Sequence, residues 1–175
     1  MKIKPDLNID RVGSYACNGQ NKLFGLDELL NAHMPQSKGK ILEVGSYRGV
    51  STSLFAFYAD AVVSVDIEIT EELRRLSQRL GNIELLCGRS ETCIPLLKDN
   101  SFDLIYIDAA HDYESVKKDI ALSLPKLKKD GVISGHDYNR DNHLGVVAAV
   151  EEFVNMGILK DIRVFSDFSW STQLG

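Results

Sequence analysis

The sequence has 175 residues, a formal net charge of −5 and 44% hydrophobic residues, which suits one domain with a sizeable core and, without a long basic run, excludes a typical nucleic-acid binder. No apolar run approaches the ~18 residues of a membrane span, and the first residues lack the apolar stretch of a signal peptide. The three cysteines form no C-x-x-C pair, so we expect a cytoplasmic protein with reduced thiols and with neither a membrane nor a nucleic acid as partner.

The first 38 residues predict an irregular lead-in followed by one amphipathic helix. Apolar residues recur there at helical spacing, at Leu23, Phe24, Leu26, Leu29 and Leu30. Pro35 and the polar residues 37–39 end this helix. We expect residues 1–38, and the loop 139–143, to be available as a lid over a substrate, and residues 39–175 to form the main domain.

Beyond residue 39, short apolar runs alternate with segments of helical periodicity. Strands are predicted at about 40–45, 61–66, 82–87 and 102–108, and at 132–134 after a turn at Gly131. Helices are predicted from about residue 49, after Thr70, around 90–97, from Asp112 to Pro125, and over 144–156. Thr70 and Asp112 are expected N-caps, and Pro125 stops the helix before it. The chain ends in two predicted strands, 162–165 and 168–174, joined by a tight turn at 166–167.

This alternation predicts an α/β fold with a mostly parallel sheet and helices on both faces. The last two strands have no helix between them, so we expect a reversed hairpin at the C-terminal edge of a seven-stranded, Rossmann-like sheet. Ligands of such sheets bind at the carboxyl ends of the strands. That rule places five residues along one rim: Glu43, Asp66, Gly88, Asp108 and Asp137.

A glycine turn follows the first predicted strand, in the segment 43–51 that reads Glu-Val-Gly-Ser-Tyr-Arg-Gly-Val-Ser. Its spacing differs from the dinucleotide pattern G-x-G-x-x-G, and Glu43 would repel a phosphate. Gly45 and Gly49 let the backbone approach a cofactor, and Ser51 starts the next helix, where it can bind a carboxylate. The segment favours a cofactor without phosphate; the alternative is a plain strand–turn–helix joint.

Asp66 ends the second predicted strand, 21 residues beyond Gly45. A carboxylate at this spacing is expected to bind the two hydroxyls of a ribose. The alternative is an exposed loop acid or a helix cap. Together with the glycine segment, Asp66 predicts a cofactor that contains ribose.

Carboxylates and imidazoles follow the fourth and fifth predicted strands, in the segments 107–111 and 135–138. Asp108 and Asp137 can hold a hard divalent cation, with His136 as a third ligand or as a group that orients the ligands. His111 is placed to take a proton from a hydroxyl, since its ordinary pKa near 6.5 suits a base at neutral pH. The alternative is that Asp108 caps a turn and the histidines make only structural hydrogen bonds. The expected position of three of the four histidines near this rim, His111, His136 and His143, counts against it.

Residues 43–51 resemble motif I of class I S-adenosylmethionine (SAM) dependent methyltransferases, and in particular that of the catechol-type, metal-dependent O-methyltransferases. Residues 107–119 and 131–138 are similar to the bacterial class I methyltransferase family 24, which includes sugar, macrolide and cephalosporin-tailoring O-methyltransferases. The resemblance covers roughly residues 39–175. It implies the class I methyltransferase fold and SAM as the cofactor. The cofactor-binding residues that it implies are Glu43, Gly45, Ser46, Tyr47, Gly49, Ser51, Asp66, Ile67, Gly88, Arg89, Ser90 and Asp108.

The resemblance also implies Mg²⁺ or a similar divalent cation at Asp108 and Asp137, and a base at His111, where catechol-type members have a lysine. The chain departs from that pattern after the fifth strand: the catechol-type motif has Asp-Asn, and this sequence has His136 followed by Asp137 and a tyrosine. Imidazole is a poor ligand for Mg²⁺. The presence of a metal is therefore left open.

These features predict methyl transfer from SAM to a small-molecule acceptor, with a hydroxyl as the expected target. In that arrangement Ile67 lies against the adenine and the loop 88–90 borders it. A catalytically inactive SAM-binding module and an NAD-linked oxidoreductase are the alternatives; the missing G-x-G-x-x-G and the terminal strand pair count against the second. A nucleic-acid methyltransferase is disfavoured because residues 108–111 lack the Asn/Asp-Pro-Pro-aromatic motif. The acceptor, the choice between O- and N-methylation and a homo-oligomeric state stay open.

Overall fold

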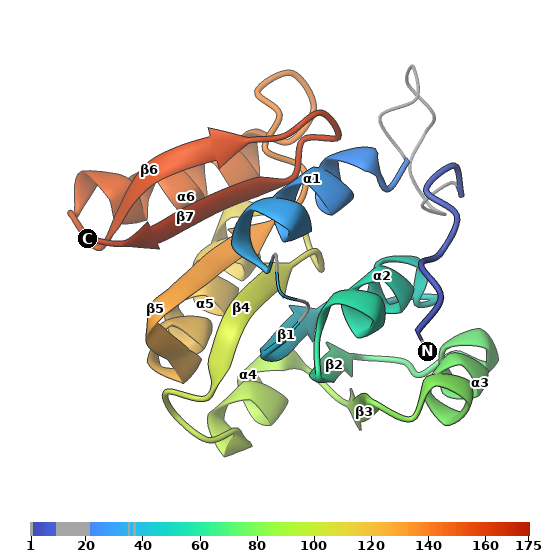
Figure 1. The fold of residues 1–175 in the computed structure, drawn as a ribbon. Helices are drawn as coiled ribbons and strands as arrows, with labels where there is room; N and C mark the ends of the chain where they lie inside the picture. The colour runs from blue at the N-terminus through green and yellow to red at the C-terminus, as the bar shows by residue number, and fades with distance from the viewer. Residues whose placement is uncertain (1, 10–21, 35, 37) are drawn as a thin grey trace.

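The computed structural model describes residues 2–9, 22–34, 36 and 38–175. They form one sheet with helices on both faces (Figure 1). The cysteine at position 17, and positions 35 and 37 at the expected end of the first helix, lie outside the described residues. Within the described residues, no helix has both the length and the apolar character needed to cross a membrane.

Seven strands alternate with the helices along the chain. The strands are β1 Lys40–Val44, β2 Ala61–Asp66, β3 Ile83–Cys87, β4 Phe102–Ile107, β5 Leu127–Gly135, β6 Leu159–Val164 and β7 Trp170–Leu174. The α-helices are α1 Phe24–His33, α2 Val50–Tyr58, α3 Glu71–Leu80, α4 Ser90–Cys93, α5 Tyr113–Ser123 and α6 Leu144–Asn155. Two short 3₁₀ helices follow α4 and α5: η1 Ile94–Leu96 and η2 Leu124–Lys126.

The strand order is β3-β2-β1-β4-β5-β7-β6. The pairs among β1 to β5 are parallel, and β7 lies antiparallel between β5 and β6. This arrangement confirms the predicted mostly parallel sheet with a reversed C-terminal hairpin. The strand order changes direction between β1 and β4, which is where ligands of open α/β sheets bind.

Both faces of the central strands are buried, because alternate side chains of each strand enter different cores. Ile105 and Ile107 of β4 point toward α4, α5 and α6, whereas Leu104 and Tyr106 point toward α1, α2 and α3. Helix α1 completes the core on the side of α2 and α3 with three fully buried side chains, Leu26, Leu29 and Leu30. The first helix is therefore packed into the domain.

Two predicted helix caps are confirmed. The Thr70 hydroxyl accepts a hydrogen bond from the Leu73 amide at 3.3 Å, at the start of α3. The Asp112 carboxylate accepts one from the Ser115 amide at 3.0 Å, at the start of α5. Helix α5 ends just before Pro125, which lies in η2.

The prediction for the fifth strand was wrong at its start. Strand β5 begins at Leu127, before Gly131, so Gly131 lies inside the strand and does not form a turn into it. The pairing with β4 passes from Phe102–Leu127 to Leu104–Val132, which is a register shift typical of a bulge. Residues 128–130, after the buried Leu127, are exposed and polar, so this part of β5 resembles a loop in the sequence.

The predicted hairpin was right in topology and wrong in its bounds. Strand β6 begins at Leu159, and residues 165–169 form the connection in place of a two-residue turn. Asp167 in this connection is buried, and it accepts hydrogen bonds from the amides of Leu26 at 3.0 Å and Ser169 at 2.8 Å. A buried carboxylate needs such donors, and these donors tie α1 to the hairpin connection.

Candidate active site

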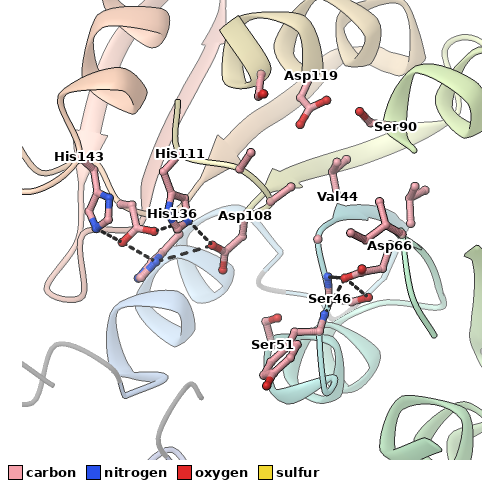
Figure 2. Close-up of a pocket in the computed structure, with 18 of the residues that line it drawn as sticks. Val44, Ser46, Ser51, Asp66, Ser90, Asp108, His111, Asp119, His136 and His143 are labelled. Carbon is pink, nitrogen blue, oxygen red and sulfur yellow. Dashed lines mark hydrogen bonds and ion pairs between the residues drawn. The ribbon is translucent and has the colours of Figure 1, made fainter. Parts of the chain in front are cut away.

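A pocket of about 1050 Å³ opens at the carboxyl ends of the central strands. Figure 2 shows Asp66 and Ser46 on one side of the pocket and three histidines with Asp108 on the other. Ser90 of α4 and Asp119 of α5 also line the pocket. Most of the predicted site residues line this pocket: Gly45, Ser46, Tyr47, Ser51, Asp66, Ile67, Gly88, Arg89, Ser90, Asp108, His111, His136 and Asp137. Glu43 and Gly49 do not line it.

Gly45 is required by a close approach between two strand ends. Its φ is +88°, and a Cβ added there would lie 2.2 Å from the carbonyl oxygen of Asp108. Gly49 precedes α2 with a φ of +81°, and its Cβ would lie 2.9 Å from the side chains of Leu73 and Leu76. Gly45 therefore joins the loop to the end of β4, whereas Gly49 lets α3 pack beneath the loop.

Replacing Gly45 by alanine is expected to destabilise the fold more than the same change at Gly81. Gly81 also has a positive φ, of +73°, but nothing lies within 4 Å of an added Cβ. Left-handed backbone costs about 1–2 kcal/mol at either site, and the contact with Asp108 adds ~1–3 kcal/mol at Gly45 alone. Urea unfolding of both variants measures the difference; equal losses of unfolding free energy would contradict the close approach.

Asp66 holds the glycine loop in place. Its Oδ2 accepts hydrogen bonds from the amides of Ser46 and Tyr47, both at 2.8 Å, and its Oδ1 accepts one from the Glu68 amide at 3.2 Å. The carboxylate also lines the pocket. The predicted ribose-binding residue thus has a second role, because it fixes the loop that passes beside the cofactor space.

Glu43 lies beneath the pocket, fully buried, and accepts three hydroxyl hydrogen bonds. The donors are Ser51 at 2.5 Å, Thr52 at 2.6 Å and Ser64 at 3.1 Å. Burial raises the pKa of Glu43 to about 7, although these hydroxyls act in the opposite direction. The position of Glu43 does not support direct contact with a cofactor, because the carboxylate points from β1 into the interior and binds the first turn of α2.

The buried Glu43 is expected to make stability fall as pH rises. Its ordinary pKa of 4.5 applies to the unfolded chain, and the folded value is about 7, so between these values only the folded state keeps the proton. The contribution of Glu43 to the free energy of unfolding is complete below pH 4.5 and is lost as the pH rises through 7. The total change is roughly 3 kcal/mol. Urea unfolding between pH 5 and 8 should give a flatter dependence for Glu43→Gln than for the wild type. The exposed Glu84→Gln variant is the control, and a wild-type slope in Glu43→Gln would contradict the assignment.

Asp119 is a pocket residue that the sequence analysis missed. It comes from α5, is 4% exposed, and lines the pocket with Ser90. Burial raises the pKa of Asp119, and a hydrogen bond from Ser90 opposes this rise. Its position could have been a signal, since Asp119 falls on the same helical face as Val116 and Ile120.

Three imidazoles converge on the Asp137 carboxylate. His111 Nε2 lies 3.0 Å from Oδ2, and His136 Nδ1 lies 3.1 Å from Oδ1. His143 Nε2 lies 3.4 Å from Oδ1; the sequence predicted His143 near this rim but gave it no contact. Asp108 Oδ1 is farther away, at 4.0 Å from His111 and 3.9 Å from His136. Asp137 has a φ of +61°, which is strained for a residue other than glycine and typical of functional sites.

These contacts set the charge of the cluster. The hydrogen bond with Asp137 raises the pKa of His111, although partial burial acts against it. Burial alone would raise the pKa of Asp137, but hydrogen bonds from His111 and His136 hold it well below its usual range. Asp137 is therefore a permanent carboxylate that orients His111.

Two groups of three side chains in this cluster could hold a metal ion. The first is Asp108, His136 and Asp137, as predicted, and the second is His111, Asp137 and His143. In the first group, Nδ1 of His136 faces the carboxylates, while its buried Nε2 has no hydrogen-bond partner among the described residues. If an ion bound Nδ1, the ring proton of His136 would be on the buried Nε2, which has no acceptor among the described residues. His136 therefore fits better as a hydrogen-bond donor to Asp137 than as a metal ligand. Asp108 and Asp137 supply the oxygen ligands that suit Mg²⁺.

Residues 42–138 match a family model described as a methyltransferase domain. A search of curated proteins found no match to the sequence. Among solved structures, the chain is similar to an O-methyltransferase from Bacillus cereus in complex with SAH, at 19% identity over 83% of this chain and 79% of that one, with a TM-score of 0.61.

It is also similar to the O-methyltransferase TomG from Streptomyces achromogenes, which is involved in tomaymycin synthesis and is in complex with SAM (16% identity, 86% of this chain, 80% of that one, TM-score 0.64). A third is the Burkholderia thailandensis 1,6-didemethyltoxoflavin-N1-methyltransferase with bound 1,6-didemethyltoxoflavin and S-adenosylhomocysteine (16% identity, 86% of this chain, 75% of that one, TM-score 0.64). At these identities the three structures show a shared fold.

Proposed function

We propose that this chain, which belongs to the methyltransferase domain family and is a SAM-dependent methyltransferase, methylates a hydroxyl group of a small-molecule acceptor. One observation carries the proposal: a single pocket has the glycine loop with Asp66 at one side and the paired His111 and Asp137 at the other. The first side suits a ribose, and the second suits removal of a proton. The volume of about 1050 Å³ leaves room for a cofactor and a small acceptor.

Each part of the cofactor is assigned to the side of the pocket whose residues suit it. The ribose hydroxyls of SAM bind Asp66, and the methionine part lies along the loop from Gly45 to Tyr47. The adenine lies against Ile67, bordered by the loop 88–90. The structural relatives that hold SAM or SAH support this cofactor. Because Ser51 donates its hydroxyl to Glu43, we assign Ser51 the role of fixing the loop beside the methionine carboxylate.

Methyl transfer is an in-line displacement in which the acceptor oxygen forms a bond to the methyl carbon as the bond from that carbon to sulfur breaks. SAH leaves with a neutral sulfur, so no acid is needed at the leaving group. The protein supplies alignment of oxygen, carbon and sulfur. His111 takes the hydroxyl proton; since its Nε2 faces Asp137 at 3.0 Å, the proton goes to Nδ1. The imidazolium that forms is stabilised by Asp137.

A divalent cation at Asp108 and Asp137, with His136 orienting Asp137, stays part of the proposal. When bound, such a cation supplies positive charge that orients the acceptor oxygen and lowers the pKa of its hydroxyl. The two carboxylates fit Mg²⁺, which keeps several waters in such sites. Titration of Mg²⁺ into the protein with SAH bound, followed by EDTA, measures whether the ion is held.

Transfer of label from methyl-labelled SAM into a panel of catechols, sugars and small amines tests the reaction. Label in hydroxyl compounds is the expected result. Label in amines alone would contradict hydroxyl methylation, and the N1-methyltransferase relative makes that control necessary. SAH binding without transfer to any compound would favour a catalytically inactive SAM-binding module.

A further inference from the structure

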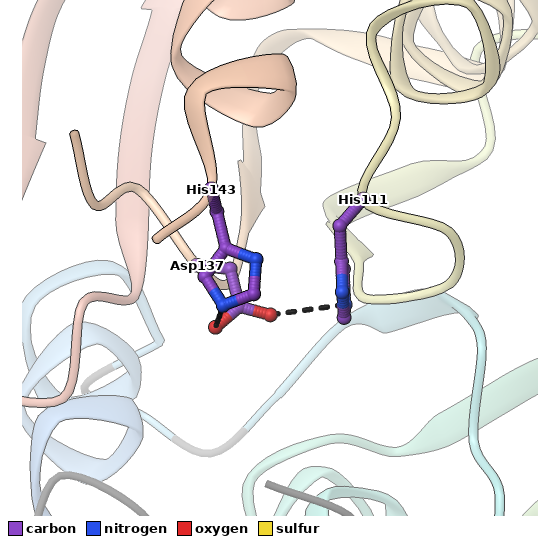
Figure 3. Close-up of side chains that lie close together, drawn as sticks. All are labelled: His111, Asp137 and His143. Carbon is purple, nitrogen blue, oxygen red and sulfur yellow. Dashed lines mark ion pairs between the residues drawn. The ribbon is translucent and has the colours of Figure 1, made fainter. Parts of the chain in front are cut away.

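We propose that His111, Asp137 and His143 form a binding site for a zinc-class transition-metal ion (Figure 3). The three residues come from the loop after β4, the loop after β5 and the position just before α6. Two imidazole nitrogens and one carboxylate thus meet at the mouth of the pocket. This site shares Asp137 with the cation site assigned above, but it takes two imidazoles in place of the carboxylate of Asp108.

The distances are close to those of a bound ion. His111 Nε2 lies 3.0 Å from Oδ2 of Asp137, and His143 Nε2 lies 3.4 Å from Oδ1. The three ligand atoms all lie within 4.8 Å of one another. Two ligands bound tetrahedrally to zinc at 2.0–2.1 Å are about 3.4 Å apart. The two imidazoles contact different oxygens of Asp137, so the side chains have to rotate toward one another to share an ion.

The donor atoms select the class of ion. Imidazole suits Zn²⁺, Co²⁺ and Ni²⁺, whereas Mg²⁺ prefers oxygen ligands. Three protein ligands also leave a fourth position of a tetrahedral ion open toward the pocket. The side chains of His111 and His143 are 44% and 30% exposed, so each can keep its second nitrogen protonated and solvated. This arrangement has no buried polar atom without a partner, unlike ligation through His136.

The consequence for catalysis rests on the proposed function. An imidazole that binds an ion through Nε2 carries its proton on Nδ1. His111 with an ion bound therefore has no lone pair for the acceptor proton. A zinc-class ion is expected to stop methyl transfer while SAH still binds, because Asp66 and the glycine loop lie on the other side of the pocket.

Calorimetric titration of Zn²⁺ into the full chain tests the site. His143→Ala and His136→Ala form a matched pair, since each removes one imidazole that contacts Asp137. Cys17→Ser and Cys87→Ser form the background of every variant, because thiols bind zinc and Cys87 is exposed. The wild-type ligands should bind one equivalent, and His143→Ala should lose affinity by ~10-fold or more. His136→Ala should keep the wild-type affinity for Zn²⁺. When Co²⁺ replaces Zn²⁺, its visible spectrum should change in His143→Ala and not in His136→Ala.

Three outcomes would overturn the site: unchanged Zn²⁺ affinity in His143→Ala, an equal loss in His136→Ala, or displacement of Zn²⁺ by equimolar Mg²⁺. Because His136 is buried, His136→Asn replaces His136→Ala if thermal melting shows that the alanine variant is unfolded. SAH binding is measured on the same samples. SAH binding without Zn²⁺ binding overturns the site alone, whereas Zn²⁺ binding that depends on His143, without SAH binding, supports the site and contradicts the proposed function.

Discussion

Replacing His111 by alanine is expected to lower the turnover number for methyl transfer by about 10²- to 10⁴-fold. The proposed base is removed, while the cofactor side of the pocket is untouched. The affinity for SAH, measured by calorimetry, should stay within about twofold, because an interaction made only in the transition state affects turnover and not ground-state binding. Turnover is measured with an acceptor identified by label transfer.

Chemical rescue distinguishes a role of His111 as the base from a purely structural role. His111 is 44% exposed, so added imidazole can enter the space left by His111→Ala and accept the proton. Partial recovery of turnover with imidazole is the expected result. A large loss of SAH affinity in His111→Ala, or full turnover without imidazole, would contradict the role of base.

Replacing Asp66 by alanine is expected to weaken SAH binding by roughly 10- to 100-fold, since charge-assisted hydrogen bonds contribute about 1.5–3 kcal/mol. The change removes the proposed ribose acceptor. It also removes the acceptor of the Ser46 and Tyr47 amides, both at 2.8 Å. The glycine loop should therefore lose its fixed position at the same time. Calorimetric titration of SAH measures the loss.

Two controls separate charge from structure at this position. Glu68→Ala removes an exposed carboxylate two residues away and should leave SAH affinity unchanged. Asp66→Asn keeps one oxygen acceptor, but it loses the charge and should lie between the alanine variant and the wild type. Wild-type SAH affinity in Asp66→Ala would contradict the ribose assignment.

The parallel part of the fold could be predicted because its strands are apolar on both sides. The runs at 62–65 and 104–107 are nearly continuous in apolar residues, as expected for strands covered by helices on two faces. Thr70 and Asp112 gave clear helix starts because their capping bonds are local. The start of β5 could not be predicted, because a register shift interrupts its pairing with β4. The exposed polar residues 128–130 also carry no strand pattern.

The candidate site could be predicted where strand ends define it. Asp66 ends β2, whereas Asp108 and Asp137 come after β4 and β5; these strands are parallel, so their carboxyl ends meet at one edge of the sheet. The direction of Glu43 was missed, because the alternation of β1 and the hydroxyls of α2 decide that it points inward. His143 was expected near the rim, but its contact with Asp137 depends on the packing of α6 against α5, which no local pattern reports.

Calorimetric titration of SAM, SAH and NAD into the purified chain tests directly whether SAM is the cofactor of this protein. Micromolar binding of SAM or SAH, without heat from NAD, is the predicted result. It would place the cofactor on the glycine loop and Asp66, and Asp66→Ala titrated alongside would verify the position. Binding of NAD, or no binding of either SAM or SAH, would contradict SAM-dependent methyl transfer by this protein.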